Sequence, residues 1–252
     1  MTDEERYLFD LNGYLVVEKA IEPGVLEAMN AYLDTQPDKD PTGKGKINAG
    51  SLLLWGREFR DQIDNPRVLP YLKELLGDTL RLDHDYAIFA EKGGAPLVLH
   101  GGGTPYDPAQ YYHCYHGKIF CGLTVASYAL VDIGPGEGGF ACIPGSHKAN
   151  FPCPPQYKDL AAASPLVKQL PMKAGDCVLF TEALTHGTLP WTAEHQRRSL
   201  FFKFSPKHLT WASSYYYPAE GKSYLSDIED QFTEAQRILL DPPSVHNHRK
   251  VP

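Results

Sequence analysis

One stretch decides the fold of this chain, and it reads Gly175-Asp176-Cys177-Val178-Leu179-Phe180-Thr181-Glu182-Ala183-Leu184-Thr185-His186-Gly187-Thr188. A Gly-Asp turn leads into a short apolar run, which predicts a buried strand at residues 176–180. A second apolar run at 198–204 predicts another strand. A histidine that closes one strand and an arginine that opens the next can hold a metal such as Fe(II) and a small dicarboxylate side by side.

Outward from this stretch, alternating residues predict further strands at 79–85, 96–100, 123–132 and 139–143. Helices are expected at 3–11, from 22 onward, at 65–76 and at 226–240. Asn65 is a candidate N-cap for the third of these helices. Ser226 with Glu229 forms a candidate capping box for the last one. Helices first, then strands with turns, then a terminal helix predict a mainly β fold with flanking helices, a double-stranded β-helix (jelly-roll, cupin-like).

The composition agrees with one folded domain over residues 1–252, because 42% of the residues are hydrophobic. The net charge of −7 provides no basic surface for nucleic acid or an anionic membrane. No apolar run has the length of a membrane span, and the acidic start is unlike a signal peptide. The five cysteines show no metal-binding spacing and favour reduced thiols in a cytoplasmic protein.

An ordered set of segments resembles the phytanoyl-CoA dioxygenase family of Fe(II)/2-oxoglutarate-dependent oxygenases. Its most recognisable motif is Ile143-Pro144-Gly145-Ser146-His147, and the other segments are 65–77, 89–100, 129–132 and 174–197. The resemblance implies Fe(II) and 2-oxoglutarate as cofactors. It also implies a metal ligand at His186, which precedes Gly187 and Thr188 as in the family. Thr188 is then a hydroxyl donor to 2-oxoglutarate.

Arg197, eleven positions after His186, matches the arginine that binds 2-oxoglutarate in the family, and Arg198 is its rival. Alternation along a strand puts these two arginines on opposite faces. The apolar residues Leu200 and Phe202 share the face of Arg198 and fit a face covered by helices. We therefore expect Arg197 to point into the cavity.

The first metal histidine is expected at His100, at the end of a predicted strand. The family has an aspartate two residues after this histidine, whereas this chain has Gly102. A missing carboxylate leaves one metal position for water, a halide or a remote carboxylate such as Asp107. His113 is the alternative first histidine, again without a nearby acid.

The leading hypothesis is an oxygenase that hydroxylates a small molecule. One alternative is a halogenase with chloride in place of the carboxylate, as His-x-Gly implies in the wider 2-oxoglutarate superfamily. Another is a non-catalytic jelly-roll that binds a ligand without turnover. The sequence identifies neither the substrate nor the oligomeric state.

Overall fold

The computed structural model describes residues 1–36, 46–47, 52–94, 96–101, 107–158, 160, 164–212, 225–246 and 249–252, with only the backbone at 46–47. Along the chain, the elements are α1 (Asp3–Asn12), β1 (Tyr14–Val17), α2 (Pro23–Asp34), β2 (Lys46–Ile47), η1 (Leu52–Leu54), α3 (Arg57–Arg60), α4 (Leu69–Leu76), β3 (Arg81–Ala90), β4 (Leu97–His100), β5 (Tyr112–Tyr115), β6 (Lys118–Cys121), β7 (Thr124–Ala129), β8 (Gly139–Cys142), η2 (Ser146–Lys148), α5 (Pro155–Lys158), β9 (Lys168–Gln169), β10 (Cys177–Thr181), β11 (His186–Leu189), β12 (Arg197–Ser205), η3 (Ser226–Gln231) and α6 (Glu234–Leu239).

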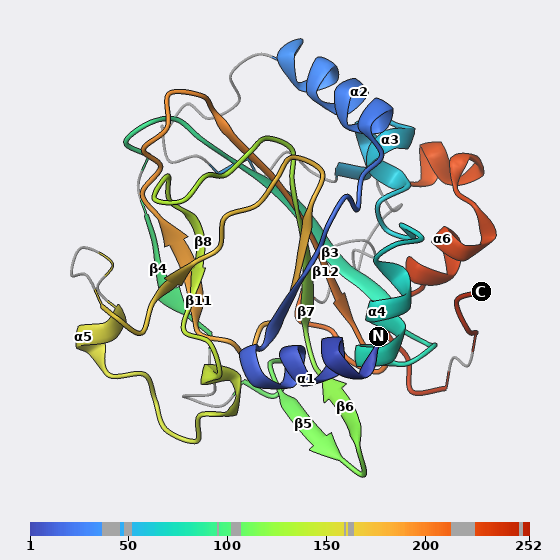
Figure 1. Ribbon diagram of the computed structural model, residues 1–252. Helices are drawn as coiled ribbons and strands as arrows, with labels where there is room; N and C mark the ends of the chain where they lie inside the picture. The colour runs from blue at the N-terminus through green and yellow to red at the C-terminus, as the bar shows by residue number, and fades with distance from the viewer. Residues whose placement is uncertain are drawn as a thin grey trace.

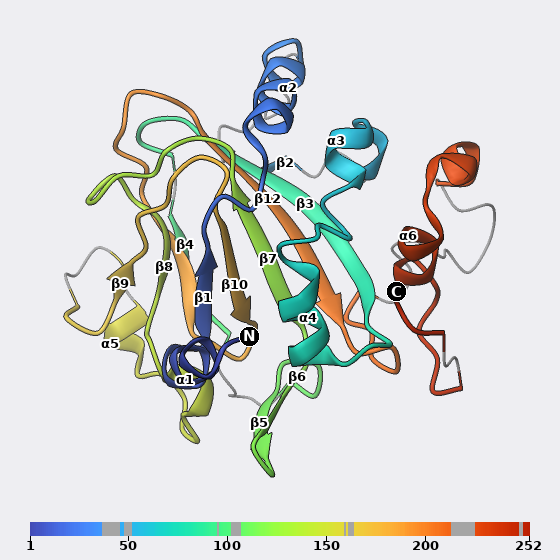
Figure 2. The same ribbon diagram turned by 45° about the vertical axis from the view of Figure 1, so that its right-hand side comes forward.

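Two antiparallel sheets form the centre of the molecule (Figures 1 and 2). The large sheet has the strand order β1-β10-β7-β12-β3-β2, and the small sheet has the order β4-β11-β8-β9. This confirms the expected mainly β fold with flanking helices. Within the described ranges the two sheets stay separate and do not close into one barrel. The β5–β6 hairpin stands apart and projects from one end of the molecule (Figure 1).

The two faces of β12 have different neighbours. Leu200, Phe202 and Phe204 belong to the apolar core that the helices α2, α3, α4 and α6 cover on one side of the large sheet (Figure 1). Phe201 belongs to a second core, together with Phe140 and other side chains of the small sheet. The period of two therefore assigns one face of β12 to the helices and the other to the space between the sheets.

Two expected helix starts are wrong. Residues 226–231 form a 3₁₀ helix, and the capping box lies at Thr233 and Gln236, at the start of α6. The Thr233 hydroxyl accepts from the Gln236 backbone N–H at 3.2 Å, and the Gln236 side chain accepts from Thr233 N–H at 3.1 Å. The helix expected from residue 65 begins at Leu69, because the Asn65 side chain caps a separate turn by accepting from Arg67 N–H.

None of the helices in the described ranges is long and apolar enough to cross a membrane.

Candidate active site

His100 and His186 lie side by side. His100 ends β4, His186 begins β11, and the two are direct partners in the antiparallel pairing of these strands. Their ring centroids are 4.3 Å apart. Cross-strand partners on one face of a sheet bring their Cβ atoms close, so this proximity follows from the register of two short strands.

The hydrogen bonds of the two rings leave the same atom free on each. The Nδ1 atom of His100 donates to the Val98 carbonyl at 2.9 Å, and that of His186 donates to the Leu184 carbonyl at 2.7 Å. A carbonyl oxygen only accepts, so Nδ1 holds the proton on both rings and Nε2 keeps its lone pair. Burial lowers the pKa of His186 to about 4 despite the opposing effect of Glu182. This ring is therefore neutral at physiological pH, as metal binding requires.

A buried carboxylate that the sequence analysis missed lies next to this pair. Glu182 is 2% exposed, and its Oε1 is 4.0 Å from Nε2 of His186. The same oxygen is 2.6 Å from Nζ of Lys203, a buried residue of β12. The contact is an ion pair between two buried charges. Burial alone would raise the pKa of Glu182, but Lys203 and then His186 outweigh it, and the pKa falls below its usual range. The acid is therefore ionised.

Arg197 and Arg198 lie on opposite faces of β12. Arg198 points to α2, where it bonds Asp34 at 2.5 Å and the Asn30 side chain at 3.0 Å. Arg197 is 1% exposed, and its Nε and Nη1 atoms have no hydrogen-bond partner in the described part of the chain. Burial lowers the pKa of Arg197 to about 10, which leaves it charged at neutral pH. A buried guanidinium with unpaired N–H groups is costly on its own and is well suited to a carboxylate.

A small cavity joins the histidines to Thr188. Its walls are mostly aromatic or aliphatic, and its lining comprises Tyr86, Ile88, Leu97, His100, Phe140, Phe180, His186, Gly187, Thr188 and Phe201. Arg197 shares one face of β12 with Phe201 of this lining. Two free Nε2 atoms, a hydroxyl and an unpaired guanidinium are donor types that suit a divalent metal and a small dicarboxylate.

The remaining sequence candidates lie elsewhere or outside the described residues. Gly102 falls outside them. The Asp107 carboxylate accepts from Ala109 N–H at 2.8 Å, an ordinary Asx turn. His113 is exposed on the β5–β6 hairpin and stacks on Tyr111, so the structure does not bring it to His186 (Figure 1). In the described part of the chain, no three His, Cys, Asp or Glu side chains already stand together as a metal cluster.

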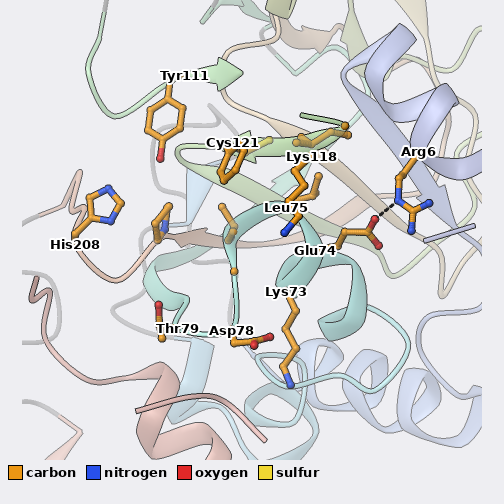
Figure 3. A pocket seen from close by; sticks show the side chains of 16 residues that line it. Arg6, Lys73, Glu74, Leu75, Asp78, Thr79, Tyr111, Lys118, Cys121 and His208 are labelled. Carbon is orange, nitrogen blue, oxygen red and sulfur yellow. Dashed lines mark hydrogen bonds and ion pairs between the residues drawn. The ribbon is translucent and has the colours of Figure 1, made fainter. Parts of the chain in front are cut away.

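A second, larger cavity of about 630 Å³ lies between α4 and the β5–β6 hairpin (Figure 3). Its charged lining includes the ion pair of Arg6 with Glu74 and the side chains of Lys73 and Lys118. It shares no lining residue with the cavity at the histidines. The volume of a cavity therefore does not by itself identify the candidate active site of this chain.

Residues 9–199 match the sequence model of the phytanoyl-CoA dioxygenase (PhyH) family. HygX from Streptomyces hygroscopicus with nickel and 2-oxoglutarate bound has a similar structure, with a TM-score of 0.76, 27% identity, and 83% of this chain and 89% of HygX covered. Its complex that also holds hygromycin B gives a TM-score of 0.74 and 28% identity over the same shares. The non-heme alpha ketoglutarate dependent epimerase SnoN of nogalamycin biosynthesis shares the fold, with a TM-score of 0.62 at 17% identity, over 88% of this chain and 91% of SnoN. No curated protein matches the sequence.

Proposed function

The chain belongs to the phytanoyl-CoA dioxygenase (PhyH) family, and from that premise we propose that it hydroxylates a small molecule with Fe(II) and 2-oxoglutarate. His100 and His186 bind the metal in this proposal, and Arg197 and Thr188 bind 2-oxoglutarate. The family is one of 2-oxoglutarate-dependent non-haem iron enzymes, which sets aside the non-catalytic jelly-roll. The observation that supports the site most strongly is the pair of adjacent imidazoles whose Nδ1 atoms are both tied to carbonyls.

When bound, iron and 2-oxoglutarate supply the oxidation of a C–H bond by O₂, with succinate and carbon dioxide as co-products. The protein supplies position and a dry environment. The backbone carbonyls of Val98 and Leu184 fix both imidazoles, which keeps each Nε2 aimed away from its own strand. The rings of Phe140, Phe180 and Phe201 line the cavity and exclude water from it.

Arg197 binds the far carboxylate of 2-oxoglutarate in this proposal. Its guanidinium is held in the interior, and its Nε and Nη1 atoms have no acceptor among the described residues. A charge-assisted bond between a guanidinium and a carboxylate would remove the cost of those unpaired groups. The Thr188 hydroxyl lines the same cavity as the histidines and can donate to the same ligand.

The substrate of this proposal is a small molecule. HygX, the solved structure at 27–28% identity, holds nickel and 2-oxoglutarate, and in a second complex hygromycin B as well. This supports a compact polar natural product as the substrate class.

The test is an anaerobic titration with Fe(II) and 2-oxoglutarate, read by the visible charge-transfer band of the complex. The wild-type protein should give the band. Arg197→Ala should weaken 2-oxoglutarate binding by about 10-fold or more. The variant loses a charge-assisted hydrogen bond, and a loss of about 1.4 kcal/mol of binding free energy lowers the affinity tenfold. Arg198→Ala is the matched control, since that arginine is paired with α2 on the other face, and its affinity should equal the wild type. Wild-type affinity in Arg197→Ala would refute the assignment.

A further inference from the structure

Glu182 has a placement that the fold alone does not require. It lies in the turn between β10 and β11, where most acids would face solvent, yet it is buried beside His186. Taking a carboxylate out of water costs several kcal/mol even when an ion pair compensates it. An apolar side chain would fill the same space at lower cost, so a role beside His186 is the simplest explanation for the acid.

The backbone around Glu182 is fixed relative to both histidines. Glu182 N–H donates to the Leu123 carbonyl at 2.9 Å, which ties the turn to the start of β7. On the other side, the turn packs directly on Gly101, since a Cβ there would lie 2.7 Å from the Glu182 carbonyl oxygen. The end of β4, the Glu182 turn and the start of β11 therefore form one rigid corner.

The separation of Glu182 from His186 agrees with two ligands of one metal ion. Two ligands at about 2.1 Å from one ion are about 3 Å apart when adjacent and about 4.2 Å apart when opposite. Oε1 of Glu182 and Nε2 of His186 are separated by 4.0 Å, within that span. A carboxylate oxygen with two imidazole nitrogens is also the donor set of non-haem Fe(II) oxygenases.

We infer that Glu182 is the carboxylate ligand of the metal held by His100 and His186, in place of the aspartate that Gly102 replaces. This inference rests on the proposed function. Lys203 acts as the positioning residue: its ammonium holds the carboxylate beside His186 and balances its charge. With a protein carboxylate in the third position, no place remains for a halide, and hydroxylation is favoured over halogenation.

Mn(II) binding to the full-length protein tests the inference without turnover. The wild type should bind Mn(II), and His186→Gln should not. Glu182→Gln should weaken the affinity by about 10-fold or more, as the loss of even a supporting residue does. Lys203→Met and the double variant Glu182→Gln/Lys203→Met form the matched pair: they differ only at Glu182, and the double variant leaves neither buried charge without its partner.

A count of metal-bound water separates a ligand from a nearby charge. Broadening of the Mn(II) resonance in ¹⁷O-labelled water reports how many waters the ion holds. Loss of a protein ligand opens one position, so Glu182→Ala should hold one more water than the wild type. If Glu182→Ala fails to fold, the comparison of Lys203→Met with the double variant gives the same answer.

The results of these measurements distinguish failure of the Glu182 inference from failure of the proposed function. Weaker binding together with one extra water supports the inference. An unchanged water number, or Mn(II) affinity that is unchanged by Glu182→Gln, overturns it and leaves the proposed function intact as long as His186→Gln abolishes binding. A wild-type protein that binds no Mn(II) overturns both.

Discussion

Gly101 should tolerate a methyl group far worse than other glycines of the same backbone conformation. Its φ is +75°, and a Cβ there would lie 2.7 Å from the carbonyl oxygens of both Glu182 and Leu184. Gly117, at the tip of the β5–β6 hairpin, has a φ of +71° and nothing within 4 Å of an added Cβ. Gly117→Ala should therefore lower the free energy of unfolding only through its left-handed backbone, by about 1–2 kcal/mol.

Gly101→Ala should lose the same amount and about 1–3 kcal/mol more from overpacking against backbone atoms. The total loss in the free energy of unfolding is then about 2–5 kcal/mol. Urea unfolding of the metal-free wild type and both variants measures the two losses at a common slope. Mn(II) affinity provides a second readout, since Gly101 follows His100 directly and Gly117 is remote from it. Equal losses of stability in the two variants would refute the argument that this corner is closely packed.

Three further predictions concern other parts of the chain. Phe202→Ala, on the helix-covered face of β12, should lower the free energy of unfolding by about 3–5 kcal/mol in urea, while Mn(II) affinity stays at the wild-type value. Burial and then Lys148 lower the pKa of His147 from 6.5 to about 4, so the unfolded chain binds a proton in that window that the folded protein does not. Stability should therefore fall as the pH drops from 6.5 to 4, and unfolding curves of His147→Gln should show a smaller fall; an unchanged pH profile would contradict this. Burial raises the pKa of both Cys121 and Cys142 to about 12, so in the native state a thiol reagent should label the exposed Cys114 and leave these two unmodified until the protein unfolds.

Strand periodicity predicted the parts of this protein that depend on local pattern. The alternation along residues 198–204 indicated that Arg197 and Arg198 face opposite ways, and the structure places Arg198 against α2 and Arg197 in the interior. His186 was expected to close a strand, but it begins β11, because the apolar run before it ends at Thr181 and a turn separates the two strands. The use of these residues as ligands stays a prediction.

Glu182 could not be placed from sequence in the same way. It lies in a turn, which has no period, and its burial depends on Lys203 from a strand further along the chain. The one available signal was an acid four residues before the candidate metal histidine. The capping boxes show a similar limit: residues 226–229 and 233–236 both fit the pattern, and only tertiary contacts decide between them. The Gln236 side chain bonds Asp64 at 2.9 Å, an interaction that no local motif reveals.

β4 is one of the two edge strands of the small sheet, and among the described residues it pairs with a strand on one side only. The position of His100 therefore depends on the pairing of β4 with β11 and on the packed corner at Gly101. A metal ion bound to both histidines would join this strand to β11 by two coordinate bonds. Metal affinity then includes the free energy that holds β4 against β11, so a substitution in β4 at a residue other than His100 would change occupancy of the site without removing a ligand.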